Sequence, residues 1–156
     1  MADKMKIAVT GHRPKGLNED AKSLEKRIAD TFLDKEPELV IVGMASGVDL
    51  IAGLAAIKTC FPYWAVLPWA GHERSHYIKG WEKEYSTVKH FAQKVIILDE
   101  SEEYPGPGAF FARNHFMVDN ATHLLAYLKP GTNRGGTFEC VNYAKKKKVP
   151  VRNIYA

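Results

Sequence analysis

The segment KPGTNRGGTFEC, residues 129–140, combines glycines, hydroxyls, an arginine and a carboxylate just before a lysine-rich stretch. Gly135 and Gly136 allow the backbone to approach a ligand closely. If a helix starts here, its free backbone N–H groups can bind a phosphate. The alternative is a flexible turn followed by a threonine N-cap. The candidate ligand contacts in this segment are Thr132, Asn133, Arg134, Gly135, Gly136 and Thr137.

A second glycine turn, TGHRP, follows the apolar run IAV near the N-terminus. Gly11 lets the chain turn sharply. Thr10, His12 and Arg13 then offer a hydroxyl, a ring nitrogen and a planar fork of donors that suits a phosphate. The alternative is a capped turn with Arg13 in solvent. We take all four residues as candidate ligand contacts.

Two further segments add candidate contacts for the sugar and the base of a nucleotide. Ser46 and Gly47 open an apolar helical segment, where they would leave N–H groups pointing at an anion. Asp49 is either a favourable partner of the helix dipole or an acceptor for a ribose hydroxyl. Pro68 and Trp69 follow another apolar run, and Trp69 could cover a base.

Arg113 and Asn114 lie near the start of a helical segment expected over residues 107–120. An arginine close to the positive end of a helix dipole is unfavourable unless it meets an anion. This position favours a ligand contact over a surface salt bridge.

The segment HERSH matches HExxH, in which two histidines on one helix face bind zinc and a glutamate activates water. It contains His72, Glu73 and His76 directly after Gly71. The surrounding pattern places it in a loop or a first helical turn rather than inside a helix. We therefore expect no bound metal.

The elements that must position these residues alternate along the chain. Short apolar runs predict strands over residues 6–10, 38–42, 63–67, 94–98, 123–128 and 149–155. Helices are expected from Asn18, as N-cap, to about residue 34, and over 48–60, 76–93, 107–120 and 136–148. The first five strands are too uniformly apolar for a sheet with one wet face. We predict an α/β three-layer Rossmann-like sandwich, a mostly parallel sheet of about six strands, and one domain over residues 1–156.

In such a sheet, ligands bind beyond the carboxyl ends of the strands. The segments that leave the predicted strands hold most of the loop glycines, histidines and free polar side chains, whereas DKEPE, CFP and KVP, which enter strands, are short and plain. This asymmetry predicts one ligand site at one edge of the sheet.

Composition sets wider limits. Hydrophobic residues make up 46% and charged residues 26%, as in ordinary globular proteins. The net charge of +4 mildly favours an anionic partner, although the run from Lys145 to Lys148 fits a solvated helix end. Cys60 and Cys140 are far apart and indicate neither a disulfide framework nor a thiolate metal site.

Several classes of protein lose support. No apolar run is long enough to cross a membrane, and MADKMKIAVTG leads into a strand without a cleavable leader, so we expect a cytoplasmic location. Neither GxGxxG nor GxxxxGK[ST] occurs, which removes the main support for NAD binding or a P-loop NTPase. We expect no cofactor.

The segments IAVTGHRP, GMASGVDLIAGLAA, LPWAGHE, ARNHFMVDNATHLLAY and NRGGTFECVNYAKKKKVPV together resemble the SLOG superfamily. This superfamily includes the Lonely Guy phosphoribohydrolases, the DNA-processing protein A family and small stand-alone members. The resemblance covers nearly the whole chain. It implies a modified Rossmann fold that binds a nucleotide or nucleotide-derived ligand with the loops after its strands, and it also implies a homo-oligomer.

The Lonely Guy hydrolases carry an RKxxM element and a PGGxGTxxE element, which supply a catalytic arginine and glutamate. RNHFM matches the first with Arg113, but Asn114 replaces the usual lysine. In the second, the GT is present, yet Cys140 occupies the glutamate position and Glu139 lies one residue earlier. One residue is a rotation of about 100 degrees on a helix, which weakens the hydrolase assignment.

Our first hypothesis is therefore a protein that binds a nucleotide-like small molecule in order to sense or sequester it. The alternative is an N-glycosidic hydrolase of nucleoside monophosphates, with Arg113 and Glu139 as catalytic residues. Binding of single-stranded nucleic acid ranks third.

Overall fold

The computed structural model describes residues 4–156. The first three residues, which begin the segment MADKMKIAVTG in which no leader is expected, lie outside this part. The elements of the sheet are β1 (Lys6–Gly11), β2 (Leu39–Val42), β3 (Tyr63–Leu67), β4 (Lys94–Ile97), β5 (His123–Tyr127) and β6 (Val151–Asn153). All observed pairings are parallel, in the order β4-β3-β2-β1-β5-β6. The predicted α/β class and the parallel sheet of six strands are confirmed.

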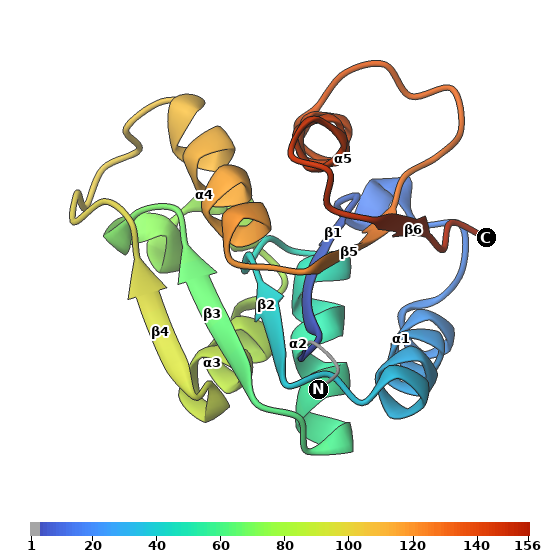
Figure 1. The fold of residues 1–156 in the computed structure, drawn as a ribbon. Helices are drawn as coiled ribbons and strands as arrows, with labels where there is room; N and C mark the ends of the chain where they lie inside the picture. Colours follow the sequence, from blue (N-terminus) through green and yellow to red (C-terminus); the bar gives the residue numbers. More distant parts are fainter. Residues whose placement is uncertain (1–3) are drawn as a thin grey trace.

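Helices cover both faces of the sheet (Figure 1). On one face, α1 (Ala21–Lys35), α2 (Val48–Thr59) and α3 (Glu82–Phe91) share a hydrophobic core with the strands. On the other, α4 (Gly108–Asp119) and α5 (Gly136–Lys146) form a second core. Because side chains alternate along a strand, Ile7 and Val9 enter the first core and Ala8 enters the second.

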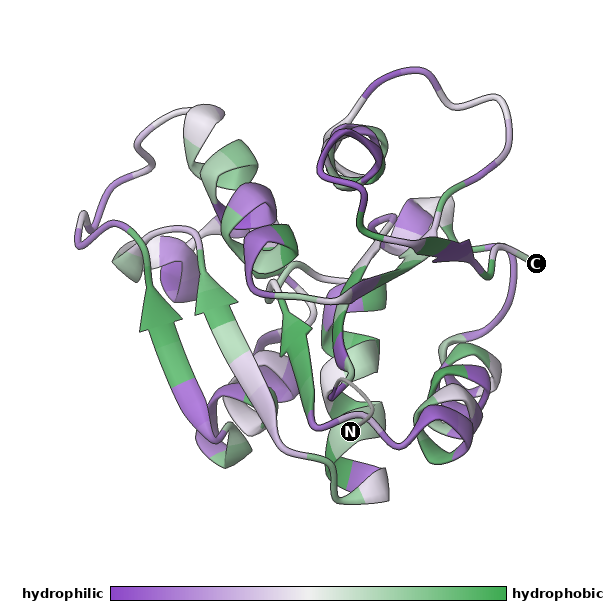
Figure 2. Ribbon diagram, in the orientation of Figure 1, coloured by the Kyte–Doolittle hydropathy of each residue, from purple (hydrophilic) through white to green (hydrophobic). Residues whose placement is uncertain are grey.

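The central strands are apolar because neither face of the sheet meets water. Every residue of β2 is buried, and Figure 2 shows this strand as hydrophobic along its length. The edge strand β4 is only partly covered, and Lys94 and Val95 are exposed. The loop between β4 and α4 is hydrophilic in the same view. Among residues 4–156, no helix combines the length and the apolar character that crossing a membrane requires.

Two helix starts differ from the sequence-based expectation. The N-cap of α1 is Asp20, whose carboxylate accepts from the Ser23 N–H at 2.8 Å, and not Asn18. Asn18 instead donates its side-chain amide to the carbonyl of Ala156 and its backbone N–H to the hydroxyl of Tyr127. The helix therefore begins after Asp20, because the Asp20 carboxylate caps the N–H three residues later.

The helix expected from residue 76 begins only at Glu82. Residues 70–74 and 76–78 form short 3-10 segments instead. Gly80 adopts φ +87°, a left-handed conformation that interrupts a helix, and its N–H donates to the Glu82 carboxylate at 2.8 Å. The last helix also ends two residues early, at Lys146, and β6 is shorter than the apolar run that predicts it.

Candidate functional site

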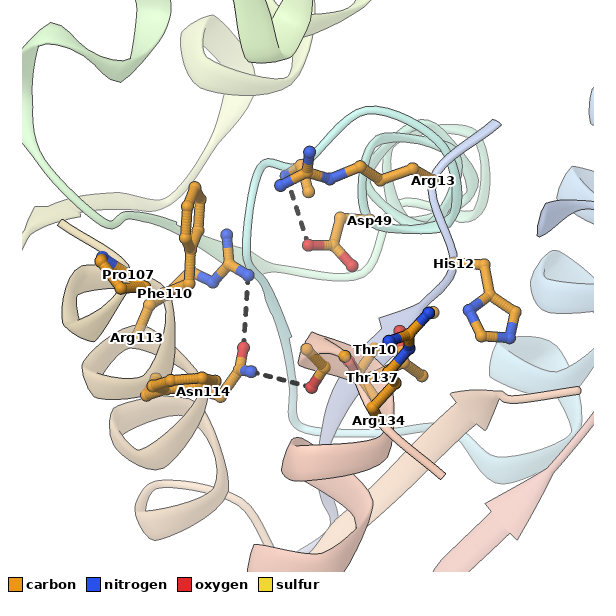
Figure 3. A pocket seen from close by; sticks show the side chains of 15 residues that line it. Thr10, His12, Arg13, Asp49, Pro107, Phe110, Arg113, Asn114, Arg134 and Thr137 are labelled. Atoms are coloured by element: carbon orange, nitrogen blue, oxygen red, sulfur yellow. Dashed lines mark hydrogen bonds between the residues drawn. The ribbon is translucent and has the colours of Figure 1, made fainter. Parts of the chain in front are cut away.

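A pocket of about 320 Å³ opens where the order of the strands reverses, between β1 and β5. This is the position at which open α/β sheets bind ligands, because the segments leaving the two strands diverge there. Its walls come from the segments after β1 and β5 and from the first turns of α2, α4 and α5 (Figure 3). The lining residues expected from the sequence are Thr10, Gly11, His12, Arg13, Asp49, Arg113, Asn114, Arg134, Gly135, Gly136 and Thr137.

The start of α5 is an open helix N-terminus at this pocket. Gly135 is the N-cap with φ +97°, and it makes no side-chain cap bond. Gly135 and Gly136 are exposed, and Thr137 stands beside them in the pocket wall. The first N–H groups of a helix have no partner within the helix and carry partial positive charge. This terminus can therefore hold an anion.

The start of α2 is closed by the protein itself. The Val48 N–H donates to the carbonyl of His12 at 3.3 Å, and the Ser46 hydroxyl donates to the carbonyl of Tyr77 at 3.2 Å. Gly47 adopts φ +91°, and a Cβ there would lie 2.6 Å from the His12 oxygen. Ser46 and Gly47 do not line the pocket; they allow α2 to pack against the loop after β1.

The loop after β1 contributes one ring and one cation. His12 Nε2 accepts from the Lys129 N–H at 2.9 Å, so this nitrogen carries no proton. Burial and the nearby Lys129 charge lower the pKa of His12, and the neutral ring has its proton on Nδ1, where it can be donated. The Arg13 guanidinium lies 4.9 Å from the Tyr77 ring centroid and 5.5 Å from that of Phe110. These contacts hold Arg13 beside the pocket.

A buried charged group forms the base of the pocket. Arg113 is 7% exposed, and its Nη1 donates to the Gly43 carbonyl at 2.9 Å while Nη2 donates to Asn114 Oδ1 at 3.3 Å. Its Nε has no partner among the described residues. A Cβ on Gly43 would lie 2.9 Å from this Nε and 2.8 Å from Asp49 Oδ2. A side chain at position 43 would therefore push Asp49 or Arg113 away from its present position.

Asp49 is buried at the same base. Burial raises its pKa to about 6, although the Arg113 charge and the Ala45 N–H, 3.2 Å from Oδ2, act in the opposite direction. A carboxyl group with this pKa changes its charge close to neutral pH. It can accept a hydrogen bond from a ligand hydroxyl or, when protonated, donate one.

Glu139 lies outside this pocket, in a neighbouring groove between α4 and α5. Its carboxylate contacts His115 Nε2 at 2.5 Å and the Asn114 amide at 3.3 Å. Cys140, at the position of the family glutamate, is fully buried, and burial raises the pKa of its thiol to about 12. Neither side chain lines the pocket. Asn133 also lines the groove rather than the pocket.

Three other candidates have structural roles. Trp69 is 1% exposed, and its ring packs against His72, Tyr104 and Phe110, so it cannot cover a ligand in the pocket. Pro68 is buried beside it. Thr132 donates its hydroxyl to the Lys129 carbonyl at 2.6 Å and holds the loop after β5.

Sequence reasoning missed the apolar wall of the pocket. Pro107, Phe110 and Phe111 line it from the start of α4, and Phe111 is 42% exposed. Their signal is the segment GPGAFFARN, in which two aromatic residues stand two and three positions before Arg113 at the ligand edge. Aromatic side chains next to donors are typical of sites for planar ligands.

The HERSH segment does not form a metal-binding cluster. His72 is buried, its Nδ1 lies 3.0 Å from the Tyr85 hydroxyl, and burial lowers its pKa to about 3. Glu73 is paired with Lys89 at 2.7 Å. His76 is exposed. Throughout the described residues, no three His, Cys, Asp or Glu side chains are grouped so that they could hold a metal ion.

The fold and the site define a Rossmann-like protein with a pocket, lined by arginines and an open helix N-terminus, at the point where strand order reverses. The model of the YspA SLOG family matches residues 7–156. The chain belongs to this family, which confirms the resemblance to the SLOG superfamily. No curated protein matches its sequence.

Solved structures agree with the fold. DNA processing protein A from Streptococcus pneumoniae is 24% identical, with a TM-score of 0.67 over 95% of this chain and 49% of that protein. DNA processing protein A from Helicobacter pylori, described with single-stranded DNA binding, is 19% identical, with a TM-score of 0.66 over 94% and 63%. The chain therefore spans about half to two thirds of these two proteins. The molybdenum cofactor binding protein from Rippkaea orientalis is 19% identical, with a TM-score of 0.62 over 97% and 76%.

Proposed function

We propose that this chain binds a nucleotide or nucleotide-derived ligand in the pocket between β1 and β5. The observation that carries this proposal is the open N-terminus of α5, which lines the same pocket as Arg13, Arg113 and Arg134. A phosphate receives backbone N–H groups from the helix start and charged donors from the arginines. Arg13 and Arg134 are exposed and accessible, whereas Arg113 is held at the base.

The base and the ribose of the ligand would contact other residues of the pocket. Phe110 and Phe111 offer ring surface for a base, and Asp49 can accept from a ribose hydroxyl. Pockets of about 300 Å³ and above commonly hold small ligands. Members of this fold include proteins named for binding a molybdenum cofactor and single-stranded DNA, so the architecture accommodates ligands of different size.

The test is a thermal and calorimetric binding screen of nucleoside monophosphates and diphosphates, with the unphosphorylated nucleosides as reference. A ligand at about 100 times its Kd adds about 2.7 kcal/mol to the free energy of unfolding. We expect stabilisation by at least one nucleotide and much less by its nucleoside. If no nucleotide stabilises the protein, the proposal is wrong.

The phosphate contact is tested with Arg134→Ala. Loss of a charged donor weakens binding by about 1.5 to 3 kcal/mol, which is at least tenfold. Arg152→Ala is the matched control, because Arg152 is also exposed but lies on β6 and does not line the pocket. Equal affinities for the two variants would remove Arg134 from the binding site.

Hydrolysis of an N-glycosidic bond is a second candidate, favoured by the pocket-lining carboxyl of Asp49. A carboxylic acid with a pKa near 6 suits general acid–base chemistry at neutral pH. Glu139, one residue before the family's glutamate position, is the other candidate for the catalytic carboxylate, but this side chain lies in the neighbouring groove. Release of free base from nucleoside monophosphates, measured by chromatography, tests the reaction.

Substitution distinguishes the role of Asp49 from that of Glu139. If Asp49 acts, Asp49→Asn abolishes base release and Glu139→Gln retains it; the reverse result would assign the role to Glu139. An absence of released base at high protein concentration would exclude the hydrolase and leave the binding proposal intact.

A further inference from the structure

A second hollow of about 510 Å³ lies beside the pocket, between α4 and α5. We call it the α4–α5 groove. It is lined by Phe111 and His115 of α4 and by Phe138, Tyr143 and Lys146 of α5. It is wider open to solvent than the pocket.

The groove and the pocket adjoin and share part of their lining. Phe111, Arg134 and Gly135 line both of them. Gly135 is the N-cap of α5, so the helix start that would hold a phosphate forms the boundary between the two hollows. A ligand whose phosphate rests at this boundary can place one group in the pocket and a second group in the groove.

The charges of the groove favour an anionic ligand. Arg134 and Lys146 contribute two exposed cations. Glu139 is the carboxylate among the lining residues, and it is engaged by His115 and by the Asn114 amide. Because the two cations outnumber this one carboxylate, a phosphate or phosphodiester is attracted to the groove.

The groove also has aromatic walls that are already in place. Phe111 is 42% exposed and Phe138 is half-buried. The His115 ring stacks on Tyr143 with centroids 3.8 Å apart and planes at 10°. The Tyr143 hydroxyl donates to Asp119 Oδ1 at 2.8 Å and holds this pair across the two helices. Exposed aromatic side chains beside cations are the features that bind stacked bases.

We propose that the α4–α5 groove is a second subsite that takes the second nucleoside of a ligand in which two nucleosides are joined through phosphate. The first nucleotide occupies the pocket, as in the proposed function on which this inference rests. The linking phosphate lies at Arg134 and Gly135. The second base stacks against Phe111 or Phe138, and Lys146 contacts the backbone of the ligand.

The experiment compares dinucleotides with mononucleotides by calorimetry, using pApA against AMP and pTpT against TMP. We expect a dinucleotide to bind at least tenfold more tightly than its mononucleotide. Lys146→Ala and Phe138→Ala should reduce this gain to less than threefold and leave mononucleotide affinity unchanged. Lys145→Ala is the matched control, because Lys145 is the exposed neighbour that does not line the groove, and it should keep the full gain.

The affinity for an octanucleotide distinguishes a free dinucleotide from a segment of a single strand. A further gain in affinity over the dinucleotide indicates a single strand, and an unchanged affinity indicates a free dinucleotide; both results require the second subsite. Equal binding of dinucleotide and mononucleotide, or equal losses in Lys146→Ala and Lys145→Ala, would overturn the subsite while the proposed function stands. If neither class of ligand binds, the proposed function fails as well.

Discussion

The N-termini of α2 and α5 have the same local structure but different surroundings. Each helix follows a parallel strand, each points its N-terminus toward the ligand edge, and each has a glycine N-cap with positive φ, 91° at Gly47 and 97° at Gly135. At α2 a protein carbonyl receives the Val48 N–H. At α5 the helix start faces the pocket.

The surroundings explain the difference. The first turn of α2 is buried, and a buried N–H without a partner is costly, so the His12 carbonyl and the close approach of its loop satisfy this terminus. Gly135 and Gly136 are exposed, where water or a ligand can take the same place. A glycine before a helix therefore indicates a close backbone approach, but burial decides whether the approaching group is protein or ligand.

The largest expected effect is the loss of stability when the closed N-terminus of α2 is disrupted. Gly47→Ala and Gly135→Ala both place a side chain at positive φ, which costs about 1 to 3 kcal/mol. Gly47→Ala also forces a Cβ to 2.6 Å from the His12 oxygen, whereas nothing lies within 4 Å of a Cβ at Gly135. Overpacking adds about 1 to 3 kcal/mol, so Gly47→Ala should be the more destabilising by this amount. Urea unfolding of both variants measures the difference, and equal losses would contradict it.

A smaller effect concerns the buried carboxyl in the first turn of α2. The pKa of Asp49 is about 6 in the folded protein, whereas the ordinary value of 3.8 applies to the unfolded chain. The folded state therefore favours the protonated form, and the stability that this contributes is complete below pH 3.8 and lost as pH rises through 6. The Asp49→Asn variant should not lose stability in this way, because its amide does not titrate. The stability of the variant relative to the unsubstituted protein should rise by about 2 kcal/mol between pH 4 and pH 7.

Urea unfolding at intervals of half a pH unit, at constant ionic strength, measures this second prediction. The difference between the two proteins cancels the titration of the remaining groups. Parallel pH profiles would show that Asp49 titrates alike in both states.

The third prediction sharpens the role of the open helix start. Proline is accepted at the first position of a helix and removes one N–H, so Gly136→Pro should change the free energy of unfolding by less than about 1 kcal/mol. It should weaken binding of a nucleotide by about 1.5 kcal/mol, or about tenfold, because one donor to the phosphate is lost. Calorimetry with the best nucleotide from the screen tests this. Unchanged affinity in a folded variant would place the phosphate elsewhere.

The equivalent change at the other helix provides the control. Val48→Pro removes the N–H that donates to His12, together with a buried side chain. It should destabilise the fold clearly more than Gly136→Pro does. If the two proline variants had the same stability, the distinction between a closed and an open terminus would not hold.

Sequence reasoning identified the strands and most of the pocket because both depend on local patterns. Uniform apolar runs such as residues 39–42 require a strand covered on both faces, and the glycine turns after β1 and β5 mark the edge where parallel strands end. Arg113 was recognised from its unfavourable position at a helix start. These features depend on neighbours a few residues apart, so the sequence alone contains them.

Long-range packing decided the rest. Trp69 follows a strand, as a ligand contact would, but Phe110 and Tyr104 enclose it. Glu139 is one residue from the family glutamate, and the contact with His115 places it in the groove. The amino-acid sequence by itself determined the layered α/β fold and the edge of the sheet that carries the site, because periodicity and backbone freedom are local properties. Only the tertiary structure decided which helix terminus is open and which polar groups are already paired, because such partners can lie 117 residues apart along the chain, as His12 and Lys129 do.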